Sequence, residues 1–174
     1  MKTKNRNGMS ERIRKLTLLG LCASVALLLS YVEAMIPPIF SAIPGIKMGL
    51  PNVAIIFVLY RYGLRDAALV STVRLIIVAM LFGTVTTFIY SLTGAVLSLL
   101  VMAILKKLNF LSTIGVSVAG GVCHNVGQIL VAMILLSTAE IGYYMIVLAF
   151  TGTIAGVLIG LAGAFLLKRF PKKI

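Results

Sequence analysis

The stretch "TVTTFIYSLTGAVLSLLVMAILK" (Thr84–Lys106) contains no charged side chain before its last residue. It is long enough for a transmembrane helix, which needs about 20 predominantly apolar residues. The whole chain has 174 residues, of which 60% are hydrophobic and 11% charged, whereas soluble domains have about 25% charged residues. A chain of this size cannot bury so much apolar surface in a core of its own. The sequence therefore predicts an integral membrane protein in contact with a lipid bilayer.

Further apolar segments flank this stretch, and each is bounded by charge, glycine or proline. None shows the residue alternation of a membrane β-barrel, so the predicted fold class is all-α, an integral membrane bundle of six transmembrane helices. The predicted spans are Ile13–Ala34, Leu50–Tyr62, Asp66–Phe82, Thr84–Lys106, Thr113–Leu136 and Gly142–Leu167. We divide the chain into a basic N-terminal segment (1–12), a transmembrane domain (13–167) and a basic tail (168–174).

The basic residues give the chain a net charge of +12. They cluster between or beyond the apolar segments and form no basic face on a soluble domain, so we expect no nucleic-acid partner. With six spans, every basic residue except Lys47 and Arg74 falls on one side of the membrane. This is the bias that the positive-inside rule describes. We therefore predict that both termini are cytoplasmic and that the segment Met35–Asn52 lies outside.

Residues that carry catalysis are scarce in this chain. The acidic residues are Glu11, Glu33, Asp66 and Glu140. A single aspartate cannot provide the paired aspartates with which a prenyl-diphosphate synthase holds magnesium. There is no P-loop, one histidine cannot complete a metal site or a triad, and the two cysteines form no CxxC pair. We expect no enzyme activity, no metal and no cofactor.

The predicted fifth span contains "GGVCHNVGQ" (Gly120–Gln128). His124 and Gln128 are four residues apart and share a helix face, with Asn125 beside them. Polar side chains at membrane depth face the interior of a bundle or a cavity because lipid offers them no partner. They either line a ligand pocket or clamp helices together. Tyr90 of the preceding span either stacks on a flat ligand or packs in the core.

The loop "MIPPIFSAIPGIKMGLPN" (Met35–Asn52) contains four of the five prolines of the chain. Prolines stiffen a loop, so this one is either a lid over an outward-facing cavity, with Lys47 toward an anionic group, or a structural cap with Lys47 in water. Glu33 either pairs with Lys47 or orients a ligand. Arg74, within the third span, either contacts a ligand anion or Glu33, or reaches toward the inner interface.

Glycines recur on one stripe of the predicted sixth span. Gly152, Gly156 and Gly160 are spaced by four residues, and Gly163 follows. Small residues on one stripe let another backbone approach closely. We expect the stripe to pack within the bundle, and the alternative is docking to a partner subunit.

Four stretches carry a resemblance to a known family, in this order along the chain: "IPGIKMGLPNVAIIFVLY" (43–60), "GTVTTFIYSLTGAVLS" (83–98), "IGVSVAGGVCHNVGQ" (114–128) and "TGTIAGVLIG" (151–160). They resemble the Gx transporter family, whose members are labelled heptaprenyl diphosphate synthase component I. That family is similar to the substrate-binding S components of energy-coupling factor (ECF) transporters. The resemblance implies a bacterial cell-membrane protein of six helices whose first outer loop covers a small-molecule site.

The resemblance also implies partners and binding residues. An S component works with a coupling transmembrane subunit and two ATPases, and it docks through small residues on its first helix. Here Gly20, Cys22, Ala23 and Ala26 offer such a face, although the alanine-x-x-x-alanine motif itself is absent. The expected ligand, a vitamin, a flavin or an isoprenoid-related compound, would contact polar residues of the loop and the later spans: Lys47, Asn52, Tyr90, His124, Asn125 and Gln128.

Two other functions fit the same resemblance. The chain could be a membrane subunit of quinone- or flavin-linked extracellular electron transfer, because members of the family occur with such components. It could also be a non-catalytic accessory component of heptaprenyl diphosphate synthesis, as the family label says. The sequence does not identify the ligand in any of these cases.

Overall fold

The computed structural model describes residues 2–35 and 49–170, and these residues form helices joined by short turns, with no strand. The elements are α1 (Lys2–Met35), α2 (Asn52–Arg61), α3 (Leu64–Phe82), α4 (Val85–Leu108), α5 (Thr113–Leu136), a 3-10 helix η1 (Ala139–Tyr143) and α6 (Tyr144–Arg169). The predicted lid with Lys47, and the last residues of the basic tail, lie outside the described residues. The all-helical prediction is confirmed for this part of the chain.

Four helical segments are long and apolar enough to cross a membrane: Met9–Met35, Val85–Leu108, Thr113–Leu136 and Ala139–Arg169. They make this chain a membrane protein. The other two predicted spans differ from them. The helix α2 has only 10 residues, about 15 Å at 1.5 Å per residue, and α3 carries Arg65, Asp66 and Arg74 within its 19 residues. The prediction of six spans therefore depends on α2 and α3, and length and composition alone do not establish it.

The sequence explains where the later helices begin and end. Thr84 caps α4 through a reciprocal pair of hydrogen bonds with Thr87, and the Ser112 hydroxyl accepts a hydrogen bond from the Gly115 N–H at the start of α5. Asn109 (φ 52°) and Ser137 (φ 49°) end α4 and α5 in the left-handed conformation. These caps keep the turns short, so α4, α5 and α6 run as antiparallel neighbours.

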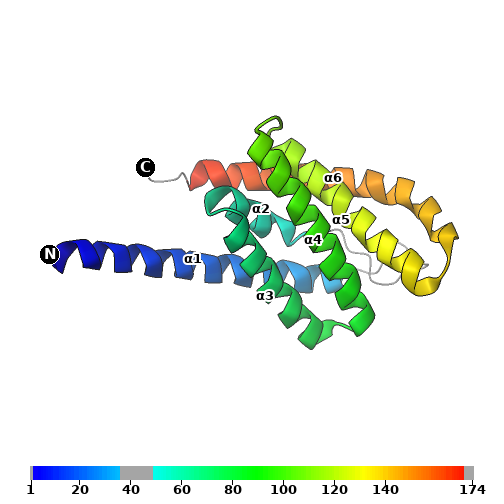
Figure 1. Cartoon of the computed structure of the whole chain (residues 1–174), viewed down its shortest axis with the longest axis horizontal. Helices are drawn as coiled ribbons and strands as arrows, with labels where there is room; N and C mark the ends of the chain where they lie inside the picture. The colour runs from blue at the N-terminus through cyan, green and yellow to red at the C-terminus, as the bar shows by residue number, and fades with distance from the viewer. Residues whose placement is uncertain (1, 36–48, 171–174) are drawn as a thin grey trace.

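In the bundle, α5 lies between α4 and α6 and packs extensively against both (Figure 1). The short helix α2 lies among α1, α3 and α6, and every residue from Ala54 to Leu59 is buried. Its apolar side chains form the centre of the main core cluster, which also includes Ala26 of α1 and Val116 of α5. Thus α2, a short apolar helix of 10 residues, fills the interior of the bundle.

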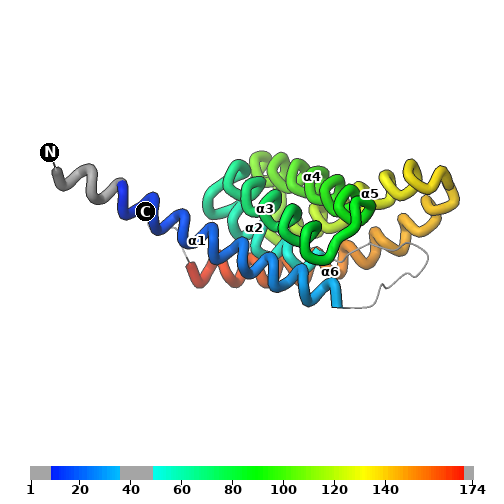
Figure 2. Tube along the Cα trace, turned by 90° about the horizontal axis from the view of Figure 1, so that it is seen from below, coloured from blue at the N-terminus to red at the C-terminus, as the bar shows by residue number. Residues whose placement is uncertain are grey.

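The basic clusters of the sequence come together at one end of the molecule. Lys15 of α1 forms an ion pair with Asp66 of α3, with 2.8 Å between Nζ and Oδ1. Lys106 of α4 donates a hydrogen bond to the Leu59 carbonyl near the end of α2. The N-terminal part of α1 and the C-terminal end of α6 leave the bundle at this same end (Figure 2). We call the region around Lys15, Arg61, Lys106 and Lys168 the basic end.

Candidate functional site

Three polar side chains of α5, namely His124, Asn125 and Gln128, are buried in the interior of the bundle. We call them the α5 polar triplet. The helix forms here because Ser112 caps its first turn and an apolar, glycine-rich sequence follows. Tyr90 of α4 is buried as well, in a second core cluster with Ile129 and Leu148. The fold therefore places all four of these predicted ligand-binding residues inside the protein.

Asn125 joins α5 to α6. Its amide Nδ2 donates a hydrogen bond of 2.7 Å to the backbone carbonyl of Leu148, and the same carbonyl accepts a hydrogen bond from the Thr151 hydroxyl. Asn125 thus acts as a clamp between two helices, one of the two roles that the sequence left open for the triplet.

His124 packs against the backbone of α4. A Cβ atom added at Gly94 would lie 2.8 Å from the His124 carbonyl oxygen and 3.0 Å from its ring. One turn further on, a Cβ added at Gly127 would lie 3.0 Å from the Cα of Gly94. The imidazole therefore occupies space that only a glycine on α4 leaves open.

Gln128 differs from its two neighbours. Its side chain is 0% exposed, and among the residues that the structure describes neither the amide nitrogen nor the amide oxygen has a hydrogen-bond partner. Leaving buried polar atoms without partners costs about 1–3 kcal/mol. Ser98 of α4, 1% exposed, has a hydroxyl in the same situation. A group that can donate to and accept from the Gln128 amide would recover this free energy.

Glu33, near the end of α1, binds the backbone just before α2. Its Oε1 accepts hydrogen bonds from the N–H groups of Gly49 and Leu50. Gly49 has φ +82°, a conformation that favours glycine, and an added Cβ would also lie 2.9 Å from the amide of Asn52. Asn52 itself is buried at the first position of α2. The sequence suggested Lys47 as the partner of Glu33, and Lys47 lies outside the described residues.

Arg74 of α3 is buried and donates a hydrogen bond of 3.2 Å to the Ser30 hydroxyl of α1. Its Nε has no partner in the part of the chain that the structure describes, and the charge of Glu33 acts on the guanidinium. A small hollow of about 20 Å³ next to it is also lined by Gly83, Thr87 and Ser91. Sequence reasoning named Arg74 and Glu33 but missed Ser30, which lies one helical turn before Glu33 and faces the same side.

The small residues predicted for partner docking lie on different faces of α1. Cys22 and Ala26 are buried in the main core cluster, and Ala23 packs partly against it. Gly20 is exposed, and an added Cβ there would meet no atom within 4 Å. Ser24 is exposed beside it. Cys22 and Ala26 therefore pack within this chain, and the Gly20–Ser24 face remains accessible.

Two larger cavities lie away from the α5 polar triplet. An apolar groove of about 180 Å³ between α1 and α6 includes Cys22, Val25 and Phe170 in its lining. A cavity of about 450 Å³ lies between α2 and α4, close to Lys106 and Lys107. Neither of these cavities, nor the hollow at Arg74, is lined by Tyr90 or by a residue of the triplet.

The sequence model of the family described as heptaprenyl diphosphate synthase component I matches residues 22–166. The match covers all of α2 to α5, most of α6 and the C-terminal part of α1 from Cys22 onward. The chain belongs to this family. No curated protein and no solved structure matches it.

Proposed function

Starting from this family membership, we propose that the chain is the substrate-binding membrane subunit of an ECF-type small-molecule transporter, similar to an S component. It would bind a vitamin, a flavin or an isoprenoid-related compound from outside, beneath the first outer loop. It would lie in a bacterial cell membrane with both termini in the cytoplasm.

The observation that carries the proposal is the Gln128 amide. Its donor and its acceptor are both buried and have no partner within residues 2–35 and 49–170, and an amide at membrane depth is costly unless something binds it. A ligand with adjacent donor and acceptor atoms would meet both needs. Asn125 would then hold α6 in place, and Tyr90 and His124 would form the adjoining walls.

The loop before α2 supports entry of the ligand from outside, beneath the first outer loop. The Glu33 carboxylate holds the backbone of Gly49 and Leu50 next to Asn52. A loop fixed in this way at its inner end can close over a ligand, with Lys47 and Asn52 at the mouth. Arg74, buried nearby and under the influence of Glu33, would attract a ligand carboxylate or phosphate.

The proposed topology uses α2 and α3 as the second and third spans. At the basic end, Lys15 of α1 pairs with Asp66 near the start of α3, and Lys106 near the end of α4 donates to the Leu59 carbonyl near the end of α2. A chain that crosses six times brings these elements to the same side. Cysteine-accessibility labelling of intact cells at Lys168→Cys, with Cys22 and Cys123 replaced by Ala, tests the cytoplasmic C-terminus. Labelling by an impermeant reagent would contradict it.

In the proposed transporter, energy coupling depends on other protein subunits. The proposed partners are a coupling transmembrane subunit and ATPases, and the accessible Gly20–Ser24 face of α1 is where they would dock. Affinity purification of the tagged chain from its own cells should recover ATPases. Recovery of redox proteins in their place would favour the electron-transfer alternative.

The experiment that tests ligand binding uses Gln128→Leu. Purified protein is screened by native mass spectrometry and thermal melting against vitamins, flavins and isoprenoids. We expect one compound to be retained and to raise the melting temperature, and we expect Gln128→Leu to abolish both effects while remaining folded. Ser98→Ala is the matched control, because it removes another buried polar group without a partner. Absence of any retained compound would argue against the proposal.

The family description favours a second candidate, an accessory role in heptaprenyl diphosphate synthesis. Its test is reconstitution of this chain with a catalytic synthase subunit. Long-chain prenyl diphosphate formation that depends on this chain would support the accessory role, and it should then be insensitive to Gln128→Leu.

A further inference from the structure

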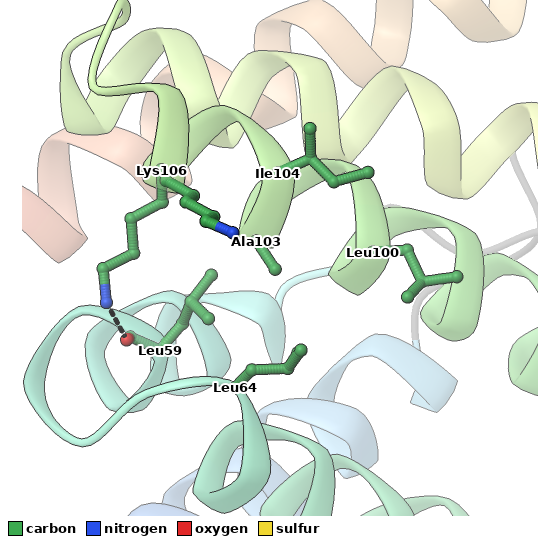
Figure 3. Close-up of a pocket in the computed structure, with 7 residues that line it drawn as sticks. Leu59, Leu64, Leu100, Ala103, Ile104 and Lys106 are labelled. Carbon is green, nitrogen blue, oxygen red and sulfur yellow. Dashed lines mark hydrogen bonds between the residues drawn. The ribbon is translucent and has the colours of Figure 1, made fainter.

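The largest of the cavities described above, about 450 Å³, lies at the basic end and has one apolar part and one charged part (Figure 3). Its volume is in the range of small-molecule sites, about 300–1,000 Å³. It is lined by residues from the end of α2, the start of α3 and the last turns of α4: Leu59, Leu64, Leu100, Ala103, Ile104, Lys106 and Lys107. No lining residue is acidic.

Positive charge dominates the charged part of the cavity. The Lys106 ammonium is 2.6 Å from the Leu59 carbonyl oxygen and 5.2 Å from the centre of the Tyr60 ring, which holds its charge at the cavity wall. Lys107 is exposed. Asp66, an acidic residue at this end, already pairs with Lys15. The electrostatic character of the site therefore suits an anion.

The apolar part opens to the surface of the bundle that faces lipid. Leu64, Leu100 and Ile104 are 43%, 49% and 57% exposed, and α4 is one of the helices long and apolar enough to cross the membrane. Acyl chains can therefore enter the cavity from the side. The two lysines lie in the last turn of α4, where a helix reaches the headgroup region and long cationic side chains extend toward the interface.

We propose that this cavity binds an anionic phospholipid from the leaflet at the basic end. One acyl chain lies along Leu100 and Ile104, and the phosphate is held by Lys107 and by the charge of Lys106. Basic pockets between transmembrane helices at this depth recognise lipid headgroups in the same way. The proposal needs only the membrane embedding of the chain and is independent of transport.

The test uses the absence of tryptophan from this chain. A Leu100→Trp variant of the full chain is reconstituted in vesicles containing brominated phosphatidylglycerol or brominated phosphatidylcholine, whose bromines quench nearby indole fluorescence. We expect the anionic lipid to be preferred by about five-fold, the ratio that one lysine near a membrane surface gives. Leu158→Trp on α6, 62% exposed, is the control and should show no preference. Ile104→Trp is a second reporter if the first does not fold.

Two further variants locate the headgroup and the chain. Lys107→Gln should remove the preference, whereas Lys168→Gln, an equally exposed lysine in the last turn of α6, should not. Ala103→Phe, which fills the cavity, should lower quenching by both lipids. Equal quenching by the two lipids at Leu100→Trp would overturn the proposal. The proposal would also be overturned if an added prenyl diphosphate relieved the quenching while excess unbrominated phosphatidylglycerol did not. The occupant would then not be a phospholipid.

Discussion

The two halves of the bundle are held together by different means. The helices α4, α5 and α6 meet at glycines, so closely that a Cβ added at Gly156 would lie 2.6 Å from the Cα of Val118. The helices α1, α2 and α3 meet through side chains: apolar ones in the main core cluster, and polar ones that link Glu33 to the backbone before α2 and Arg74 to Ser30. The two larger cavities lie where the second half meets the first.

This difference indicates which half can rearrange. Backbones in direct contact leave no room for sliding, because any displacement forces atoms to overlap. Side chains between helices can change rotamer and let their helices shift without forcing backbone atoms to overlap. We therefore interpret the α4–α6 half as a rigid frame that carries the α5 polar triplet, and the α1–α3 half as the part that responds to a ligand or a partner.

The largest expected effect comes from the glycine contacts of the frame. Gly156→Ala should lower the free energy of unfolding by about 3 kcal/mol, the upper end of the usual cost of overpacking, because the added methyl meets backbone atoms of α5. Gly20→Ala on α1, where an added Cβ meets nothing within 4 Å, should have no such cost and gain helix propensity. Denaturation in detergent measures both. Equal effects would remove the distinction between the halves.

Glu33 should give the next largest effect. Glu33→Ala removes a charged acceptor from the N–H groups of Gly49 and Leu50, at an expected cost of about 2 kcal/mol, since hydrogen bonds to charged groups contribute about 1.5–3 kcal/mol. Hydrogen exchange at the Gly49 amide should accelerate in the variant. Glu140→Ala, at an exposed position of η1, is the control and should change stability by less than about 0.5 kcal/mol.

The helices of the frame could be predicted closely from the sequence. The predicted span Thr113–Leu136 has the bounds of α5, and α4 and α6 differ from prediction by a few residues, because long apolar segments with caps leave little choice. The first helix differs more: it begins at Lys2, since lysine and arginine favour helices and do not end them. The bounds of α2 lie close to the predicted Leu50–Tyr62, but apolar composition does not show whether a buried helix of 10 residues crosses the membrane.

The site was predictable as a set of residues but not as a set of contacts. Spacing placed His124, Asn125 and Gln128 near one another on α5. It could not show that Asn125 binds the Leu148 carbonyl while Gln128 binds none of the described residues, because those partners depend on how α4 and α6 are placed. In the same way, the family resemblance named Cys22 and Ala26 as part of a docking face without showing that they are buried in the core.

Substitutions at Asn125 and Gln128 should change the stability of the protein by less than those at Gly156 and Glu33, and by different amounts from each other. Asn125→Leu should cost about 0.6 kcal/mol and at most about 1.7 kcal/mol, the range for hydrogen bonds between membrane helices. Gln128→Leu, nearly equal in volume, should be neutral or stabilising in the absence of ligand, since it removes buried polar atoms that have no partner among the described residues. Melting of the two purified variants checks the difference. A loss at Gln128 as large as at Asn125 would mean that Gln128 has a structural partner.

The smallest effect should come from the ion pair between Lys15 and Asp66 at the basic end. The two charges are 2.8 Å apart, but the Lys15 side chain is 44% exposed, so solvent and salt screen the pair, and exposed pairs contribute about 0.2–1 kcal/mol. Lys15 also lies 5.7 Å from the centre of the Tyr62 ring, so single substitutions mix two interactions. A double-mutant cycle of Lys15→Gln and Asp66→Asn isolates the ion pair, and its coupling should shrink as salt is raised. A coupling free energy above about 2 kcal/mol that salt does not change would contradict this prediction. It would mean that α1 is fixed to α3 as firmly as α5 is to α6, so the α1–α3 half could not be the part that responds to a ligand or a partner.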